Sequence, residues 1–276
     1  MGTLYVVSTP IGNLEDISYR GVRILQEVSL IAAEDTRTAR VLLQHYDIST
    51  PLSSYHDFSS GKKITQLLSK LEHEDLAVIS EAGTPGINDP GYALITAALD
   101  AEHRVIPIPG PSAPLTALSA SGLPTDSFLY LGYLPRKSKA RRDQLAEVSD
   151  LPHTLIFLES PHRLLDSLDD IHSVLGNREL TVAREMTKIH EEYFQATVSQ
   201  AREYFSQGSP RGEFTLVIAG AGEQDLKWSA PRVRAALEQA RSEGKKSASG
   251  IAKQLAQESG WDRREIYDMI NAQNDS

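Results

Sequence analysis

The chain has 276 residues, a formal net charge of −9 and no cysteine. Its length predicts roughly two domains, with a core large enough to fold without cross-links. The absence of cysteine excludes disulfides, thiolate metal sites and a cysteine nucleophile, and it is consistent with a reducing cytoplasm. The acidic balance argues against a compact basic DNA-binding protein, so local basic patches must carry any contact with nucleic acid.

The N-terminus leads into an apolar strand almost at once, at residues 4–7. No basic segment or long apolar stretch precedes this strand, so we expect no signal peptide and no membrane span. These features predict a cytoplasmic protein.

Apolar runs typical of buried strands alternate five times with segments of helical spacing in the first half of the chain. The expected strands are residues 4–7, 30–33, 51–55, 76–79 and 105–108. The expected helices lie around residues 17–28, 41–43, 64–71, 92–99 and 113–121. Such an alternation predicts a parallel α/β domain, which we assign to residues 1–122.

A second alternation follows a hinge-like segment at residues 122–126. Strands are expected at residues 128–131, 154–158, 180–183 and 214–218, and helices after the basic run at 136–142 and at 164–175. We therefore expect a second α/β domain at residues 123–222, with more hairpin-like connections than the first.

Residues 223–276 are expected to form a polar linker, at 223–230, and a small helical module. Helical spacing recurs at residues 233–240, 248–255 and 264–270, and the break at 259–262 resembles a helix-turn-helix corner. From Lys227 onward nine Lys and Arg residues stand against seven Asp and Glu residues. Two interpretations stay open: a helical cap packed on the body, or a module that contacts RNA.

Polar or Gly/Pro-rich loops follow four of the expected strands in the first domain, at residues 8–13, 34–37, 81–91 and 109–113. The longest holds three glycines and two prolines, which expose backbone groups, and the carboxylates Glu81 and Asp89. Because the carboxyl ends of parallel strands lie along one edge of a sheet, these loops can meet in one crevice. The sequence therefore predicts a small-molecule site there.

Several common catalytic motifs are absent from the sequence. It has no G-x-x-x-x-G-K-[ST] phosphate loop, no G-x-G-x-x-G after the first strand, no His-x-x-x-His pair and no G-x-S-x-G elbow. His162 lies at a strand end among charged residues, where a lone histidine is more often structural than catalytic. We expect no metal, and the loops suit an organic ligand held mainly by backbone groups.

Five motifs occur in order along the chain. They are Ser-Thr-Pro-Ile-Gly-Asn-Leu at residues 8–14, Ala-Glu-Asp-Thr-Arg at 33–37, the long loop at 80–91, Pro-Gly-Pro-Ser-Ala at 109–113 and Glu-Ser-Pro-His-Arg at 159–163. Together they resemble the bacterial ribosomal RNA small subunit (cytidine-2'-O)-methyltransferases. These enzymes belong to the tetrapyrrole methylase superfamily, the class III S-adenosylmethionine-dependent methyltransferases.

The resemblance implies two α/β domains with S-adenosylmethionine in the cleft between them, and a homodimer. The implied substrate is a cytidine in the decoding centre of small-subunit ribosomal RNA. The superfamily usually has Gly-Pro-Gly after the first strand and Gly-Asp-Pro in the long loop. Here the matching residues are Pro-Ile-Gly at 10–12 and Gly-Thr-Pro at 83–85, which favours the RNA-modifying branch.

The resemblance also assigns cofactor binding to residues in the strand-end loops and in the second domain. These are Pro10, Gly83, Thr84, Pro85, Ile87, Asp89, Ser112, Ala113, Glu159, Met186 and Phe214. Structural alternatives stay open for three of them: Pro10 as a turn residue, Ser112 as a helix N-cap and Met186 as a core residue.

Methyl transfer to a ribose 2'-hydroxyl requires in-line attack on the sulfonium methyl group and help for a weakly acidic hydroxyl. Two clusters of mixed charge at strand ends supply the candidates Glu34, Asp35, Arg37, Glu159 and Arg163. A carboxylate, Asp35 or Glu159, can accept the proton, while an arginine can hold phosphate or lower the hydroxyl pKa. The same residues can instead form a salt-bridge network between the domains or between subunits, and a reaction without a general base also stays open.

A basic run lies at the expected start of the helix after residue 135. Its members are Arg136, Lys137, Lys139, Arg141 and Arg142. Such a run is usually a solvated helix start, but in an acidic RNA enzyme it is the best candidate for phosphate contact. Two other functions stay open: methylation of a tetrapyrrole precursor or another small molecule, and a non-enzymatic ribosome-associated factor that retains the fold.

Overall fold

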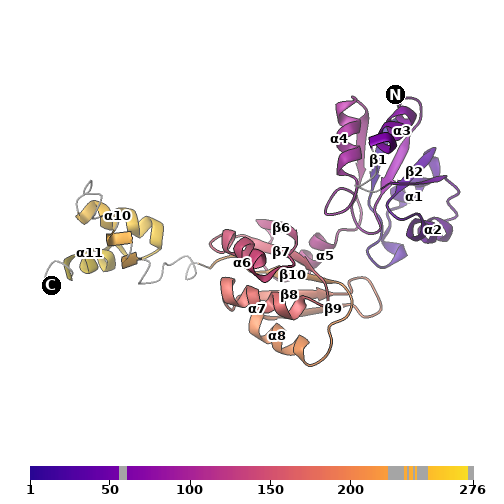
Figure 1. The fold of residues 1–276 in the computed structure, drawn as a ribbon. Coiled ribbons are helices and arrows are strands. Elements are labelled where there is room, and N and C mark those ends of the chain that lie inside the picture. Colours follow the sequence, from indigo (N-terminus) through magenta and orange to yellow (C-terminus); the bar gives the residue numbers. More distant parts are fainter. Residues whose placement is uncertain (56–60, 223–232, 235, 239, 241–247, 273–276) are drawn as a thin grey trace.

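The structure is a computed structural model that describes residues 1–55, 61–222, 233–234, 236–238, 240 and 248–272. These residues form two α/β domains, each built on a five-stranded sheet, and a C-terminal helical module (Figure 1). The predicted fold class is therefore confirmed. The predicted linker at residues 223–230 lies outside the described residues.

The first domain is built on a parallel sheet with the strand order β3-β2-β4-β1-β5. Its strands are β1 (Thr3–Val7), β2 (Leu30–Ala33), β3 (Leu52–Ser54), β4 (Leu76–Ile79) and β5 (Arg104–Ile108). Its helices are the short 3₁₀ helix η1 (Leu14–Asp16), α1 (Tyr19–Glu27), α2 (Thr36–His45), α3 (Gly61–Leu71) and α4 (Tyr92–Asp100). All five predicted strands and their parallel pairing are confirmed.

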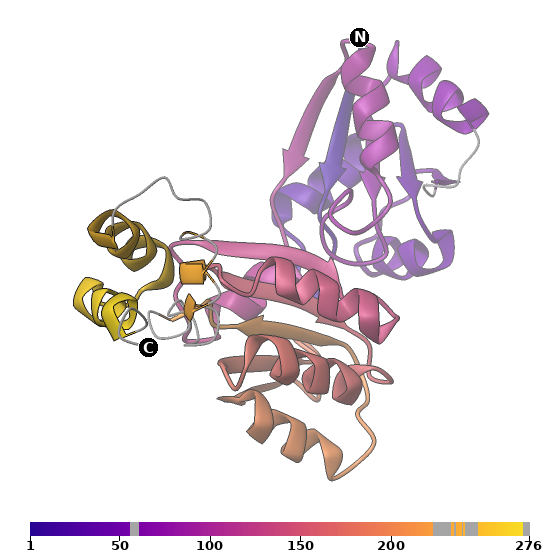
Figure 2. The ribbon, with the colours of Figure 1, turned by 60° about the vertical axis from the view of Figure 1, so that its left-hand side comes forward.

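Strand β4 is buried along its whole length because it pairs on both edges and carries a core on each face. Its side chains alternate between the faces, as in any strand. Ala77 and Ile79 pack with apolar residues of α1 and α2, whereas Leu76 and Val78 pack with those of α3 and α4. The first domain is therefore a three-layer sandwich in which the sheet lies between two pairs of helices (Figure 2).

The second domain is built on a mixed sheet with the order β6-β7-β10-β8-β9, in which only β6 and β7 pair in parallel. Its strands are β6 (Phe128–Tyr133), β7 (Thr154–Glu159), β8 (Glu179–Arg184), β9 (Glu192–Thr197) and β10 (Phe214–Ile218). Its helices are α6 (Ser138–Glu147), α7 (Leu164–Leu175) and α8 (Val198–Ser206). The antiparallel pairs confirm the predicted hairpin-like connections.

Strand β9 and helix α8 are not among the elements predicted from the sequence. Signals for both elements are nonetheless present, because β9 holds the adjacent aromatic residues Tyr193 and Phe194, a residue type that favours strands. The helix opens with a capping box in which Thr197 and Gln200 satisfy each other's backbone N–H groups.

Helix α5 (Ala113–Ser119) links the two domains. Its residues Ala117 and Leu118 are buried against Ile156 of β7 and Val217 of β10, on the sheet of the second domain. The Thr181 hydroxyl of β8 donates a hydrogen bond of 2.9 Å to the carbonyl of Ser121, just beyond the helix. The predicted boundary at residue 122 assigns α5 to the first domain. In the structure, however, α5 packs on the sheet of the second domain.

The C-terminal helices α10 (Ala248–Ser259) and α11 (Arg263–Ala272) form a module with a small core of its own. Ile251 and Leu255 of α10 pack with Ile266 and Ile270 of α11, and Figure 1 shows both helices apart from the two domains. The predicted corner is confirmed between the helices, where Gly260 adopts a φ of 66°. No helix in the described part of the chain has the length and apolar composition needed to cross a membrane.

Three loops at the carboxyl edge of the first sheet are tied together. Thr9, after β1, exchanges backbone hydrogen bonds of 2.8 and 3.0 Å with Gly83, after β4. The hydroxyls of Ser8 and Thr84 lie 2.9 Å apart, and the Thr84 hydroxyl reaches the carbonyl of Pro111, after β5, at 3.4 Å. The predicted convergence of these strand-end loops is therefore confirmed.

Replacing Gly110 with alanine tests how closely these loops must pack. A Cβ atom at Gly110 would lie 2.9 Å from the Cβ of Ser8, so the loops after β1 and β5 must separate. We expect Gly110→Ala to lower the free energy of unfolding by about 1–3 kcal/mol in denaturant titrations.

The matched control is Gly208→Ala, because a Cβ atom there meets nothing within 4 Å. We expect this control to change stability by less than about 0.5 kcal/mol. Equal unfolding midpoints for the two variants would show that the loops have room to move.

Candidate active site

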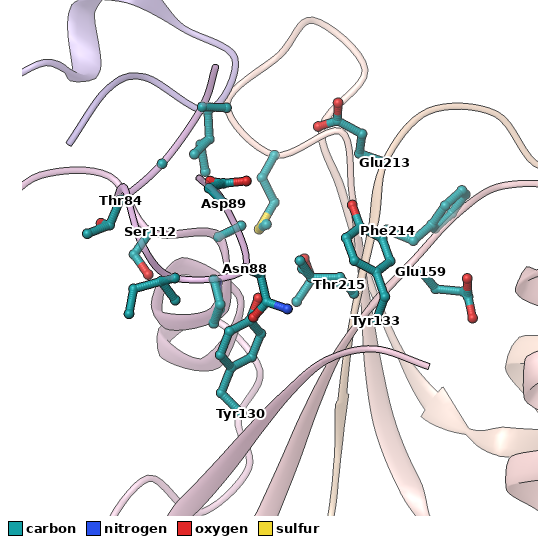
Figure 3. Close-up of a pocket in the computed structure, with 18 residues that line it drawn as sticks. Thr84, Asn88, Asp89, Ser112, Tyr130, Tyr133, Glu159, Glu213, Phe214 and Thr215 are labelled. Atoms are coloured by element: carbon teal, nitrogen blue, oxygen red, sulfur yellow. The ribbon is translucent and has the colours of Figure 1, made fainter. Parts of the chain in front are cut away.

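A pocket lies between the two domains at the strand-end loops (Figure 3). It encloses about 900 Å³, counting the space open to solvent at its mouth. We call it the inner pocket, and it is lined by Ile11, Ala82, Gly83, Thr84, Ile87, Asn88, Asp89, Ser112, Ala113, Pro114, Tyr130, Tyr133, Leu158, Glu159, Met186, Glu213, Phe214 and Thr215.

Nine of the eleven residues predicted to bind a cofactor line this one pocket. They are Gly83, Thr84, Ile87, Asp89, Ser112, Ala113, Glu159, Met186 and Phe214. Pro10 instead lines a neighbouring pocket, and Pro85 lines neither. Residues separated by more than 100 positions in the chain thus come together because strand ends of both sheets face the same space.

The long loop after β4 follows a path that needs left-handed backbone at four positions, Gly83, Gly86, Asn88 and Gly91. Three are glycines, which adopt positive φ without steric cost, and asparagine tolerates it better than most residues. The Asn88 side chain reaches the bulge in β6, where a Cβ atom on Gly132 would lie 2.2 Å from its Nδ2. The loop therefore presses directly on the second domain.

Asp89 projects from this loop into the inner pocket (Figure 3). Burial raises the pKa of Asp89 to about 6, with a further contribution from the charge of Glu34, while a hydrogen bond from Ser80 acts in the opposite direction. Across the pocket, burial and the charge of Asp89 raise the pKa of Tyr130 to about 12, so this phenol stays protonated. None of the described neighbours that shift the pKa of Asp89 is a cation.

Ser112 and Met186 bear on the alternatives left open by the sequence. Ser112 is the N-cap residue of α5, yet its side chain makes no capping hydrogen bond and lines the pocket. Met186 is 8% exposed and packs with Ala183 and Val217, and it also lines the pocket. It therefore belongs to the core and to the pocket wall at the same time.

The charged side chains that line the inner pocket are all acidic: Asp89, Glu159 and Glu213. Lys, Arg and His are absent from its described lining. This charge pattern disfavours phosphate-bearing cofactors and suits a ligand that carries positive charge.

Glu159 and Arg163 form a buried ion pair. The Glu159 side chain is fully buried, and Arg163 Nη2 lies 2.8 and 2.9 Å from its two oxygens. Its oxygens also accept hydrogen bonds from the Ser160 N–H, at 2.7 Å, and the Ser167 hydroxyl, at 2.5 Å. Figure 3 shows this carboxylate directed away from the pocket, and the pair is a salt bridge within the second domain.

A second, more open pocket adjoins the inner one and shares Ile11, Ala82 and Glu213 with it. We call it the outer pocket. Its other lining residues are Thr9, Pro10, Gly12, Leu14, Asp35, Arg37, Thr38, Ala39, Val41, Leu42, Ile79, Ser80, Glu81 and Lys188. It carries both acidic and basic side chains, so it differs from the inner pocket in charge.

Asp35 and Arg37 meet at the mouth of the outer pocket. Asp35 is the N-cap of α2, where its Oδ1 accepts the backbone N–H of Arg37 at 2.7 Å. Hydrogen bonds from the side chain and backbone of Arg37 lower the pKa of Asp35 to about 2. The guanidinium of Arg37 remains largely exposed. The side chain of Glu34 accepts a 3.5 Å hydrogen bond from the backbone N–H of Glu81.

The predicted basic run divides into one buried and four exposed residues. Arg141 is 3% exposed and pairs with Asp170 at 2.6 Å, so its charge is satisfied inside the second domain. The exposed residues are Arg136, Lys137, Lys139 and Arg142. They begin three residues after Tyr133, which lines the inner pocket and is 56% exposed.

Sequence reasoning missed several residues of the two pockets, among them Asn88, Tyr130, Tyr133, Lys188 and Glu213. For Glu213 a signal exists. Strand β10 runs antiparallel to β7 and β8, with Phe214 opposite Glu159 and Arg184. The start of β10 therefore lies beside the carboxyl ends of its neighbours, at the edge that forms the site.

Solved structures share this architecture. The methyltransferase CobJ aligns with a TM-score of 0.61 at 18% identity, covering 80% of this chain and 95% of that chain. A uroporphyrin-III C-methyl transferase from Thermus thermophilus, complexed with S-adenyl homocysteine, aligns with a TM-score of 0.56 at 18% identity, covering 79% of this chain and 97% of that chain. These likenesses show a shared two-domain fold.

The family model for tetrapyrrole (corrin/porphyrin) methylases matches residues 3–202, and the chain belongs to that methyltransferase family. Within it the chain groups with proteins called ribosomal RNA small subunit methyltransferase I. One, from Escherichia coli O157:H7, is 50% identical over 86% of this chain and 85% of its own length. Another, from Halalkalibacterium halodurans, is 44% identical over 98% of this chain and 95% of its own length.

The raised pKa of Asp89 predicts a stability difference that depends on pH. The folded protein holds this proton up to about pH 6, whereas the unfolded chain releases it near pH 3.8. Its stabilising contribution is therefore complete below pH 3.8 and is lost as pH rises through 6. We expect Asp89→Asn to be more stable than the parent protein at pH 7.5 by about 1 kcal/mol, since solvent screens this half-buried group.

Denaturant titrations at pH 7.5 and pH 4 check this expectation, because the difference should vanish at the lower pH. Asp126→Asn, at an exposed position, is the control and should show no such dependence. A stability of Asp89→Asn equal to or below that of the parent at both pH values would contradict the proposed cost of the charge.

Proposed function

We propose that this protein transfers the methyl group of S-adenosylmethionine to the ribose 2'-hydroxyl of a cytidine in small-subunit ribosomal RNA, near the decoding centre. The observation that carries the proposal is the likeness, along almost the whole chain, to proteins called ribosomal RNA small subunit methyltransferase I. The tetrapyrrole methyltransferases of known structure are far less similar, at 18–19% identity for the uroporphyrin enzymes.

The inner pocket fits S-adenosylmethionine in charge and in shape. Asp89 and Glu213 face a space that contains no basic side chain among its described lining, which suits a ligand with a sulfonium and an ammonium group. Gly83 leaves the backbone of the long loop open, because a Cβ atom there would meet only Ile11, at 3.7 Å. When bound, S-adenosylmethionine supplies an electrophilic methyl group.

The chain's own residues would hold this cofactor from both domains. The hydroxyls of Thr84 and Ser112 and the exposed backbone of residues 83–88 offer hydrogen bonds to its polar groups. Met186, Phe214 and the ring of Tyr130 exclude water from the other side. Holding both reactants in line supplies several kcal/mol of the rate enhancement, and the dry apolar wall prevents hydrolysis.

We propose that RNA reaches the cofactor through the outer pocket. Arg37, on the first domain, lines this pocket with a largely exposed guanidinium and can contact a phosphate that flanks the target nucleotide. The exposed part of the basic run continues the positive surface beyond Tyr133.

The basic run also has an unusual position in its helix. The N-cap of α6 is Lys137, which makes no side-chain capping bond, and Lys139 stands in the first turn. Positive side chains at the positive end of a helix are unfavourable, and binding of a phosphate anion relieves the repulsion.

We further propose that the protein is a homodimer that acts in the cytoplasm. The first proposal rests on the family resemblance and the second on the cysteine-free sequence without an expected signal peptide or membrane span. Light scattering or sedimentation of the purified protein tests the first.

The direct test is incubation of the purified protein with S-adenosylmethionine labelled in its methyl group. The substrates are small ribosomal subunits from cells that lack this protein, naked small-subunit RNA and a tetrapyrrole precursor, each in a separate reaction. We expect label in the RNA, in a dinucleotide that resists alkaline cleavage, because a 2'-O-methyl group blocks attack on the adjacent phosphate. Label only in the precursor would move the protein to the small-molecule branch, and cofactor binding without transfer would favour a binding factor.

Charge reversal of the exposed basic run tests its contact with RNA. We expect the triple variant Arg136→Glu, Lys137→Glu, Lys139→Glu to weaken RNA binding and to reduce the slope of log affinity against log salt by roughly 2. Fluorescence anisotropy at four salt concentrations measures this slope. Lys62→Glu combined with Lys70→Glu, on α3, is the control, and an unchanged slope in the triple variant would remove the run from the interface.

A further inference from the structure

Glu213 stands at the junction of the two pockets. It is one of three residues that line both, and the only one of the three with an ionisable side chain. Its side chain is 77% exposed, and its carboxylate lies 3.1 Å from Lys188 Nζ, which lines the outer pocket. Glu213 therefore lines both the outer pocket and the inner pocket that suits a methyl donor.

The surrounding chain holds Glu213 in place. Its backbone exchanges two hydrogen bonds of 3.0 Å with Glu185: the Glu213 N–H donates to the Glu185 carboxylate, and the Glu185 N–H donates to the Glu213 carbonyl. Lys188 also donates to Glu185 Oε1 at 3.0 Å, so one lysine joins both acids. Burial opposes the charge of Lys188, yet these bonds raise its pKa overall and keep the ammonium protonated.

Glu185, Lys188 and Glu213 form a cluster of charged side chains. Two glycines make room for this cluster because they have no side chains. Gly212 has a φ of 94°, and a Cβ atom on it would lie 2.4 Å from the Cγ of Glu185. Gly12, in the first domain, has no room for a Cβ atom because Lys188 Cγ would be 2.6 Å away. The cluster is therefore packed against the loop after β1 and does not simply extend into solvent.

Three other carboxylates near the site are poorly suited to accept a proton from the substrate. Glu159 is buried, paired with Arg163 and directed away from the inner pocket. Asp35 has a pKa of about 2 and caps α2, which makes it a weak base. Asp89 lines only the inner pocket, where it suits the cationic cofactor.

We propose that Glu213 is the catalytic base of the methyl transfer and that Lys188 is the residue that positions it. The inference rests on the proposed function. The ribose 2'-oxygen forms a bond to the methyl carbon, the bond from that carbon to sulfur breaks, and its electron pair stays on sulfur. The hydroxyl proton passes to the Glu213 carboxylate and from there to water, which the exposure of this side chain permits. Lys188, whose Nζ lies 3.1 Å from this carboxylate, fixes the orientation of the carboxylate at the junction of the two pockets.

Single-turnover methylation of small ribosomal subunits by Glu213→Gln tests the inference, with cofactor and RNA affinities measured in parallel. We expect the rate at saturating substrate to fall about 100-fold or more while both affinities stay within about three-fold of the parent. Glu213→Asp should recover part of the rate because it retains the carboxylate. Lys188→Met should slow the reaction in the same way, and Lys188→Arg less so.

The control is Glu203→Gln, an exposed glutamate on α8, which should react at the parent rate. A rate for Glu213→Gln within three-fold of the parent would overturn the inference and leave the proposed function standing. So would a rate loss matched by an equal loss of cofactor affinity, or a larger rate loss in Asp89→Asn with its affinities intact. Absence of methylation by the parent protein would overturn the proposed function, and this inference with it.

Discussion

The site depends on the hydrogen bonds that tie together the loops after β1, β4 and β5. Thr9 and Gly83 exchange backbone bonds as an isolated antiparallel bridge beyond the ends of β1 and β4, and the Ser8 and Thr84 hydroxyls extend this link toward Pro111. Buried backbone groups need such partners, because an unpaired N–H or C=O costs about as much as a lost hydrogen bond. The link fixes the first-domain side of the inner pocket and leaves the rest of the long loop to face the second domain.

The second domain completes the pocket from an antiparallel sheet. Its strands β7 and β8 end, and β10 begins, at the same edge, so Glu159, Met186 and Phe214 reach one space from three different segments. Contacts such as that of Asn88 with Gly132 hold the two domains together at this point. A cofactor that contacts both sides of the pocket therefore depends on the relative position of the two domains as much as on any single loop.

Charge separates the roles of the two pockets. The inner pocket presents carboxylates alone among its described charged residues, as a cationic methyl donor requires, whereas the outer pocket adds Arg37 and Lys188. The proposed path of RNA through the outer pocket relies on the exposed guanidinium of Arg37, because the described lining of the inner pocket offers phosphates no cationic side chain. Glu213, shared by both, stands where the two substrates of the proposed reaction would meet.

The sequence predicted the elements whose signals are local. Four-residue apolar runs such as β2 and β4 and the Gly/Pro content of the long loop indicated both the parallel sheet and the edge where its loops converge. Pairings between distant segments had no such signal. Arg141 appeared to belong to an exposed basic run, but it is buried against Asp170, which is 29 residues away in the chain. The place of Glu213 was likewise hidden, because it follows from the antiparallel direction of β10.

The most direct test of this account is a crystal structure of the protein with S-adenosylmethionine or its demethylated product. We predict that the ligand occupies the inner pocket, in contact with the backbone after Gly83, with Ser112 and with Met186, and with its sulfur on the side of Glu213. A ligand bound elsewhere, or bound in the inner pocket with its sulfur turned away from the outer pocket, would contradict the account.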